Sequence, residues 1–233
     1  MTLQTDDPRL LSLDTEMIQE AWAGIRRDCT GFIKAFVRIK DEDTGMASPF
    51  SLWPEQERAL REIQEHRLTV VLKARQIGLT WLALAYAIWC MLCRAGFSVT
   101  VISQTEIKAK ELVQRCELIL RYMPPWIITY GKKSNEGLTW ESTSQNLIIH
   151  HPDGEDSKLL ALPSAPGTAR SLTASLLILD EWAFQEYAEA IWSSAFPTIN
   201  RPTGGQVIGL STSELGTLFV EIWHGAVAGE NGF

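Results

Sequence analysis

The sequence lacks the features that mark membrane, secreted or disulfide-stabilised proteins. Its longest apolar run extends from Trp81 to Cys93 and is closed by Arg94, which is short of the roughly 20 residues that a bilayer span needs. Residues 1–9 are polar and acidic rather than a signal peptide. The 4 cysteines do not suggest a disulfide framework. We therefore expect a soluble, cytosolic protein that does not contact a membrane.

Two of these cysteines, Cys90 and Cys93, form a C-x-x-C pair. Such pairs occur in zinc and redox sites, but a second pair of ligands is missing here. Both residues also fall within the apolar run, where a three-residue spacing places them on one side of a helix. Buried thiols are the favoured interpretation.

An excess of positive charge is also lacking. The chain has 21 Lys and Arg against 28 Asp and Glu, for a net charge of −7 and a pI near 5.2. This balance excludes a protein whose whole surface is a basic nucleic-acid glove, although it allows a few basic loops. With 233 residues, of which 45% are hydrophobic, the chain is long enough for one large domain with a buried core.

Four short apolar runs indicate strands that are buried on both faces, namely 68–72, 99–102, 176–179 and 207–210. Helical patterns separate them, and this alternation predicts a parallel α/β sheet. Alternating residues over 139–162 indicate a hairpin or a small antiparallel excursion. Ahead of the sheet, residues 10–40 are predicted to be helical, 41–49 to be a polar turn and a domain boundary, and 54–66 to be a helix.

The segment 73–80, KARQIGLT, joins the first strand to the apolar helix. A strand, a glycine-containing loop and a helix present backbone N–H groups and a positive helix end to a phosphate. The usual phosphate loop carries lysine directly after its second glycine, but Leu79 stands there, and Ala74 replaces the first glycine. Taken alone, this segment fits a phosphate site and an ordinary strand-to-helix turn about equally well.

If the segment does bind phosphate, its cation comes from the start of the loop. Lys73 and Arg75 both lie there, and we favour Lys73 with Arg75 as its partner. Gly78 would let the backbone approach a phosphate closely, and the Thr80 hydroxyl would ligate Mg²⁺.

A second pattern, LLILDE at 176–181, places two acids at the carboxyl end of a buried strand. Ligands of parallel sheets bind at that edge. Asp180 would hold Mg²⁺ through water, and Glu181 would polarise the water that attacks the terminal phosphate. An acidic helix cap is the simpler alternative for the acids alone, but together with the glycine loop they favour a nucleoside triphosphatase.

Three segments in this order, KARQIGLT, LLILDEWAF and the GLSTS of 209–213, resemble the ATPase domain of the large terminase subunit of tailed bacteriophages. The resemblance covers residues 29–224. It implies an ASCE/RecA-like P-loop NTPase fold, in which a parallel central sheet is flanked by helices, with a small helical lid segment over 1–48 and the ATPase domain over 49–233. It also implies ATP and Mg²⁺ as ligands, bound by the loop residues Lys73, Ala74, Arg75, Gln76, Ile77, Gly78, Leu79 and Thr80.

The resemblance assigns four further residues. Gln56, in the segment before the loop, would read the adenine edge with its amide. Ser211 and Thr212 would sense the terminal phosphate and couple its loss to movement. Arg170, eleven residues before Glu181, would act on the nucleotide of a neighbouring subunit.

The family's biology implies the partners. These are non-specifically bound double-stranded DNA, further copies of the chain in a ring on a portal protein, and a small terminase subunit, all in the cytoplasm of the bacterial host. The family's carboxyl-terminal nuclease domain is absent from this chain, which has no Asp after Asp180, and no nuclease activity is expected from the chain alone. Two alternatives are a helicase-like protein and a degenerate nucleotide-binding module of prophage origin with little turnover.

Overall fold

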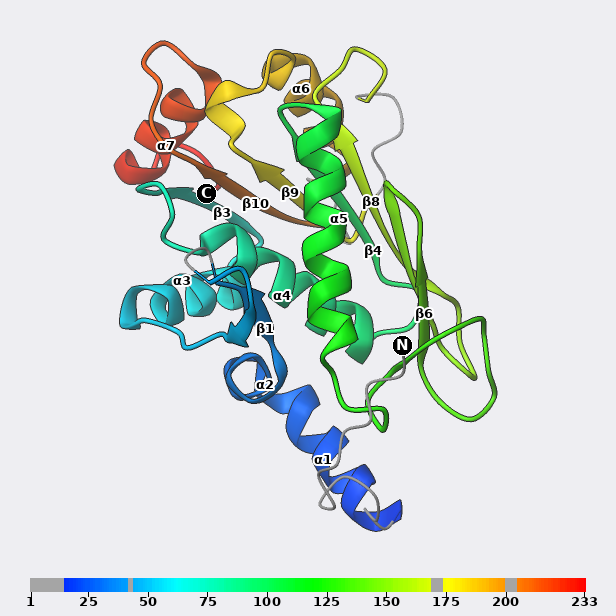
Figure 1. Ribbon diagram of the computed structural model, residues 1–233. Helices are drawn as coiled ribbons and strands as arrows, with labels where there is room; N and C mark the ends of the chain where they lie inside the picture. The colour runs from blue at the N-terminus through cyan, green and yellow to red at the C-terminus, as the bar shows by residue number, and fades with distance from the viewer. Residues whose placement is uncertain (1–14, 42–43, 169–173, 200–204) are drawn as a thin grey trace.

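The computed structural model describes residues 15–41, 44–168, 174–199 and 205–233. A large sheet runs through the molecule, and helices cover both of its faces (Figure 1). In the described part of the chain, this sheet has eight strands in the order β3-β10-β9-β4-β8-β7-β6-β5. The predicted α/β fold with a mostly parallel central sheet is confirmed.

The parallel half of the sheet contains the four strands expected from the apolar runs. β3 (Leu68–Leu72) pairs with β10 (Gln206–Ser211), which pairs with β9 (Leu176–Asp180). β9 pairs with β4 (Ser98–Ser103), and β4 with β8 (Ser157–Pro163). β10 therefore separates the strand before the glycine loop from the strand that ends in the acids.

The other half of the sheet is the antiparallel excursion that the sequence predicts. β7 (Asn146–His150) pairs antiparallel with β8 on one side and with β6 (Thr139–Ser142) on the other. The short β5 (Thr129–Tyr130) completes this edge in parallel with β6.

Alternate residues of the central strands face two separate apolar cores, as the two-residue period of a strand requires. Leu176 and Ile178 of β9 face the core that contains α4 (Leu79–Cys93) and α5 (Glu106–Arg121). Leu177 and Leu179 face the core on the opposite side. That second core contains residues of α6 (Ala188–Ile199), of α7 (Leu218–Ala228) and of the short 3-10 helix Trp182–Phe184.

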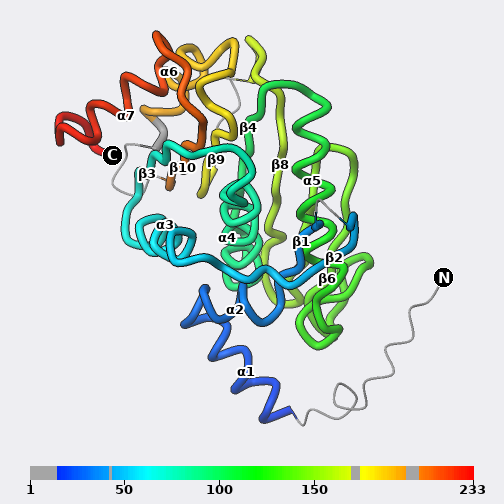
Figure 2. The backbone as a smooth tube through the Cα atoms, turned by 60° about the vertical axis from the view of Figure 1, so that its left-hand side comes forward, coloured from blue at the N-terminus to red at the C-terminus, as the bar shows by residue number. Residues whose placement is uncertain are grey.

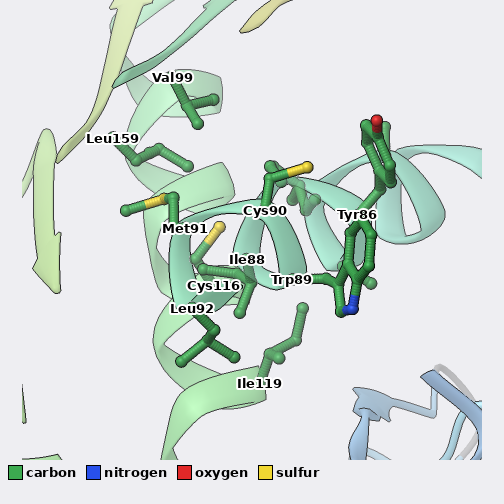
Figure 3. Close-up of a cluster of buried hydrophobic side chains, with 14 of the residues drawn as sticks. Tyr86, Ile88, Trp89, Cys90, Met91, Leu92, Val99, Cys116, Ile119 and Leu159 are labelled. Atoms are coloured by element: carbon green, nitrogen blue, oxygen red, sulfur yellow. The ribbon is translucent and has the colours of Figure 1, made fainter. Parts of the chain in front are cut away.

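Helix α4 is apolar around its whole circumference because it is covered on every side. It packs against the sheet, α5, α2 (Cys29–Phe36) and α3 (Pro54–Glu65). Figure 3 shows its Met91 near Leu159 of β8, with Cys116 of α5 beside the helix. Cys90 is buried and Cys93 half-buried, which confirms the buried-thiol interpretation for Cys90. Burial raises the pKa of both thiols to about 11.

The amino-terminal part differs from the single helical stretch that was predicted. Two helices, α1 (Thr15–Arg27) and α2 (Cys29–Phe36), meet at Asp28, whose Oδ1 accepts the Gly31 N–H at 2.8 Å and so starts a new helix. Figure 2 shows α1 extending away from the sheet at the end opposite to α6. Helix α2 packs on α4 within the main core.

The predicted polar turn over 41–49 is largely a β-hairpin. β1 (Arg38–Lys40) pairs antiparallel with β2 (Ala47–Pro49). Asp41 supports the turn, since its Oδ1 accepts the backbone N–H and the hydroxyl of Thr44, both at 2.8 Å. The predicted boundary at 48/49 thus falls inside a strand, and the division into two domains remains a prediction.

Candidate functional site

Lys73 and Glu181, two of the predicted site residues, meet at the carboxyl edge of the sheet. The Nζ of Lys73 lies 2.5 Å from Oε1 of Glu181, and only 6% of the lysine side chain is exposed. The backbone holds Lys73 in place, because its N–H donates to the Ser211 carbonyl at 2.9 Å. The glycine loop and the acidic strand end therefore form one site, although β10 lies between their strands.

A second contact joins the same two segments. The Thr80 hydroxyl, in the first turn of α4, donates to Oδ1 of Asp180 at 2.8 Å. Burial raises the pKa of the Asp180 carboxyl, while the Thr80 hydrogen bond and the nearby cations of Lys73 and Arg115 favour its ionised form. A hydroxyl and a carboxylate placed together are the protein ligands that Mg²⁺ takes beside phosphate oxygens.

These oxygen ligands fit a magnesium ion that is shared with phosphates rather than one held by protein alone. Within the described ranges, no cluster of three or more His, Cys, Asp or Glu side chains could hold a metal. The carboxylate of Asp180 and the hydroxyl of Thr80 would supply two positions, and Mg²⁺ usually completes its shell with water and substrate phosphate.

The loop itself adopts the backbone conformation that its glycine predicts. Gly78 has a φ of 71° and directly precedes α4. A Cβ at this position would lie 2.7 Å from Nε2 of Gln56. The positive φ and this close approach therefore both disfavour a larger residue than glycine. Glu181 also has a positive φ, 49°, which is uncommon for a residue with a side chain and is typical of functional sites.

Gln56 is placed differently from what an adenine-reading role suggests. Only 5% of the residue is exposed. Its Oε1 accepts the Trp53 N–H at 2.9 Å, and its Nε2 donates to the Ile77 carbonyl at 2.8 Å. In this structure the amide therefore supports the glycine loop, and the adenine contact remains a prediction.

The predicted coupling residues lie at the end of β10, where Ser211 is the last residue of the strand and Thr212 comes directly after it. Ser211 is fully buried, and its hydroxyl accepts the Ala183 N–H at 3.0 Å, two residues beyond Glu181. Thr212 is half-buried. Ser211 thus contacts the loop through its carbonyl and the acidic segment through its hydroxyl, while the sensing role remains a prediction.

Sequence reasoning missed Gln185. This buried residue donates from Nε2 to the carbonyls of Asp180 and Ile102, each at 3.0 Å. It therefore fixes the end of the acidic strand against β4. A polar pair, Gln185 and Glu186, within the otherwise largely apolar segment 182–188 was the available signal.

A cavity of about 320 Å³ opens at this edge of the sheet. The glycine loop forms one wall, Glu181 another, and the β1–β2 hairpin a third. Arg75 is exposed and is not among the described residues that line the cavity, whereas Lys73 is. The residues that line the cavity are Ile39, Lys40, Asp41, Ser48, Lys73, Gln76, Ile77, Gly78, Leu79, Thr80, Trp81, Arg115 and Glu181.

The β1–β2 hairpin supplies part of the cavity lining, and the helical lid segment over 1–48 remains a prediction. Arg170, the residue expected to act on a neighbouring subunit, lies outside the described residues, and its role remains a prediction.

No model of a protein family matches this sequence. Among solved structures, the large terminase of bacteriophage HK97 superposes on 89% of this chain and 42% of its own, with a TM-score of 0.63 and 14% identity. The large terminase ATPase domain of Thermus phage P74-26 superposes on 70% of this chain and 67% of its own, with a TM-score of 0.53 and 21% identity.

A third similar structure is the large terminase of the thermophilic bacteriophage D6E in complex with ADP. It covers 69% of this chain and 39% of its own, with a TM-score of 0.51 and 12% identity. This chain thus spans less than half the length of the HK97 and D6E proteins. At such identities the likeness shows the fold alone, a mixed α/β architecture with a mostly parallel central sheet flanked by helices.

Within the described residues, no helix is long and apolar enough to cross a membrane.

Proposed function

We propose that this chain is the ATP-hydrolysing motor domain of a viral DNA-packaging terminase, which couples ATP hydrolysis to movement of double-stranded DNA into a procapsid. The observation that carries the proposal is the convergence of Lys73, Thr80, Asp180 and Glu181 at one sheet edge, through contacts of 2.5 Å and 2.8 Å. A cation, a hydroxyl and two carboxylates are the groups that phosphoryl transfer to water requires.

Each group has a distinct task in this reaction. Lys73 and the backbone N–H groups of the glycine loop bind the phosphate oxygens. Mg²⁺, when bound at Thr80 and Asp180, neutralises charge on the terminal phosphates. Glu181 then orients the attacking water. For this, the Glu181 carboxylate has to separate from Lys73, whose ammonium group pairs with the phosphates instead.

The wider assignment follows the resemblance and the likeness of fold. Double-stranded DNA binds without sequence preference, and the chain works in a homo-oligomeric ring on a portal protein, together with a small terminase subunit and a nuclease domain, in the host cytoplasm. Arg170 acts on the neighbouring nucleotide, while Ser211 and Thr212 relay phosphate loss. The solved D6E terminase in complex with ADP supports nucleotide binding by this fold.

One observation favours an alternative, a nucleotide-binding module with little turnover. The Lys73–Glu181 ion pair occupies both the phosphate cation and the water-orienting acid. If bound nucleotide leaves this pair closed, the chain would bind ATP without hydrolysing it.

A hydrolysis assay separates these proposals. Phosphate release from Mg-ATP should be measurable, should rise on addition of linear duplex DNA at low salt, and should be absent from Glu181→Gln. Binding of ATP without phosphate release at any protein or DNA concentration would favour the low-turnover module. Failure to bind either ATP or ADP would overturn the whole assignment.

A further inference from the structure

Arg115 is a cation in the nucleotide cavity that the sequence patterns do not single out. It lies in the middle of α5, a helix that belongs to neither the glycine loop nor the acidic strand. Nevertheless it lines the cavity together with Lys73, Thr80 and Glu181. Arg115 therefore adds to Lys73 and Lys40 a third positive group in the lining of this cavity.

An aromatic ring, rather than a carboxylate, holds this guanidinium. Its central carbon lies 5.1 Å from the centre of the Trp81 ring, a distance at which a cation is attracted to the face of an indole. Among the described residues, no acidic side chain forms an ion pair with Arg115. Lys73, by contrast, is already paired with Glu181. Arg115 is thus free to pair with an incoming anion.

The position of Arg115 indicates which part of a nucleotide it would meet. Arg115 lines the same cavity as Lys73, Thr80 and Glu181. In the proposed reaction Glu181 orients the water that attacks the terminal phosphate, so the γ-phosphate would lie on the Glu181 side of this cavity. A diphosphate lacks the group that would reach this side.

We propose that Arg115 contacts the γ-phosphate of bound ATP from within the same subunit, and that the Trp81 ring positions its guanidinium for this contact. The inference rests on the proposed ATPase function and adds a residue that distinguishes ATP from ADP. Arginine suits this task because its planar fork can both stack on an indole and donate two parallel hydrogen bonds to phosphate.

Nucleotide titrations of the whole chain test the proposal without relying on turnover. Wild type, Arg115→Ala and Arg115→Lys are titrated with ADP and with a non-hydrolysable ATP analogue, each with Mg²⁺ and with EDTA. Arg115→Ala should weaken binding of the triphosphate by about 10- to 100-fold, the range of a charge-assisted hydrogen bond, and ADP binding by less than about 3-fold. The affinity of Arg115→Lys for the triphosphate should lie between that of wild type and that of Arg115→Ala.

The controls separate contact from structural support. Arg121→Ala removes an exposed arginine from the same helix and should leave both affinities unchanged. Trp81→Ala should show part of the selective loss of triphosphate affinity. Trp81→Phe, which keeps an aromatic face, should bind the triphosphate almost as tightly as wild type. If the loss disappears in EDTA, Arg115 acts through Asp180 and the metal, and the proposed contact is wrong.

Equal losses for ADP and the triphosphate, or no loss in either Arg115 variant, would also overturn the proposal. If Arg115→Ala fails to fold, the Arg115→Lys comparison carries the same test, because a lysine keeps the charge but loses the fork. Failure of the wild type to bind any nucleotide would instead contradict the ATPase function itself, so the two failures are distinguishable.

Discussion

Lys73 and Glu181 are 108 residues apart in the sequence, yet their charged groups lie 2.5 Å from each other. The side chain of the lysine is almost fully buried, so removal of Glu181 would leave its charge without compensation. This ion pair links the glycine loop to the acidic strand end. In the proposed ATPase, a phosphate would therefore have to compete with Glu181 for Lys73.

The first prediction concerns the loop cation. Lys73→Ala should lower ATP hydrolysis by about 100-fold or more, as expected when a preorganised charge is removed from a site of phosphoryl transfer. Arg75→Ala should cause a smaller loss, because Arg75 is exposed and does not line the cavity. Steady-state phosphate release measures both. A larger loss in Arg75→Ala, or a double variant that retains the parent rate, would contradict this assignment.

The two acids should give different phenotypes. Glu181→Gln should still bind Mg-ATP but hydrolyse it very slowly, because the attacking water loses its orienting carboxylate. Asp180→Asn should instead lose the part of nucleotide affinity that depends on Mg²⁺. Titrations with and without Mg²⁺ separate these effects, and identical behaviour of the two variants would refute this division of roles.

Asp180 should also make stability depend on pH. Because its folded-state pKa is raised above the ordinary value of 3.8 by burial, its ionisation opposes folding once the pH exceeds that value. Without nucleotide, Asp180→Asn should therefore be more stable than wild type at pH 7. This advantage should shrink as the pH falls towards 3.8. Urea unfolding at several pH values measures it.

Asp156 supplies the control with the opposite sign. Burial acts to raise the pKa of this carboxyl, but contacts with His150 and Lys133 outweigh it, and the net pKa is lowered. Asp156→Asn should consequently reduce stability at neutral pH, and its effect should fade as the pH falls through the lowered folded-state pKa. A common sign for both variants would show that burial does not dominate at Asp180.

A fourth prediction concerns packing behind the acidic segment. A Cβ on Gly209 of β10 would lie 2.5 Å from Cε3 of the fully buried Trp182. Gly209→Ala should lower the free energy of unfolding by about 1–3 kcal/mol, the usual cost of overpacking a core. It should also slow ATP hydrolysis, because Trp182 directly follows Glu181.

Gly137→Ala is the matched control for this substitution, since a Cβ there would meet no atom within 4 Å. It should leave both stability and hydrolysis close to wild type. Chemical denaturation and the phosphate assay on both variants complete the comparison. Equal stability of the two alanine variants would mean that Trp182 moves aside freely.

Patterns in the sequence located the parallel strands, because strands buried on both faces are continuous apolar runs between turns. They could not give the order of the strands, since an apolar run carries no information about its neighbours. The hairpin Arg38–Lys40 and Ala47–Pro49 was missed for a related reason. Its strands are short and polar, so no hydrophobic periodicity marks them in the sequence, and they depend on tertiary contacts.

The site residues likewise divide into those that a local sequence pattern reveals and those that depend on tertiary packing. Lys73, Thr80, Asp180 and Glu181 were identified because each belongs to a local pattern of strand, loop and helix. Arg115 was not identified, because one arginine on an amphipathic helix has the signature of a solvated face. Its place beside Trp81 depends on how α4 and α5 pack, which local spacing does not encode.

The position of β10 has a consequence for how the site is assembled during synthesis. Residues 206–211 are the last strand of the sheet in sequence, yet they lie between β3 and β9. The glycine loop and the acidic pair leave the ribosome well before them, on strands that do not pair directly with each other. Because β3 and β9 each pair with β10 and not with each other, the two halves of the site take their spacing from β10. We therefore expect a chain that ends before residue 206 to present no complete site.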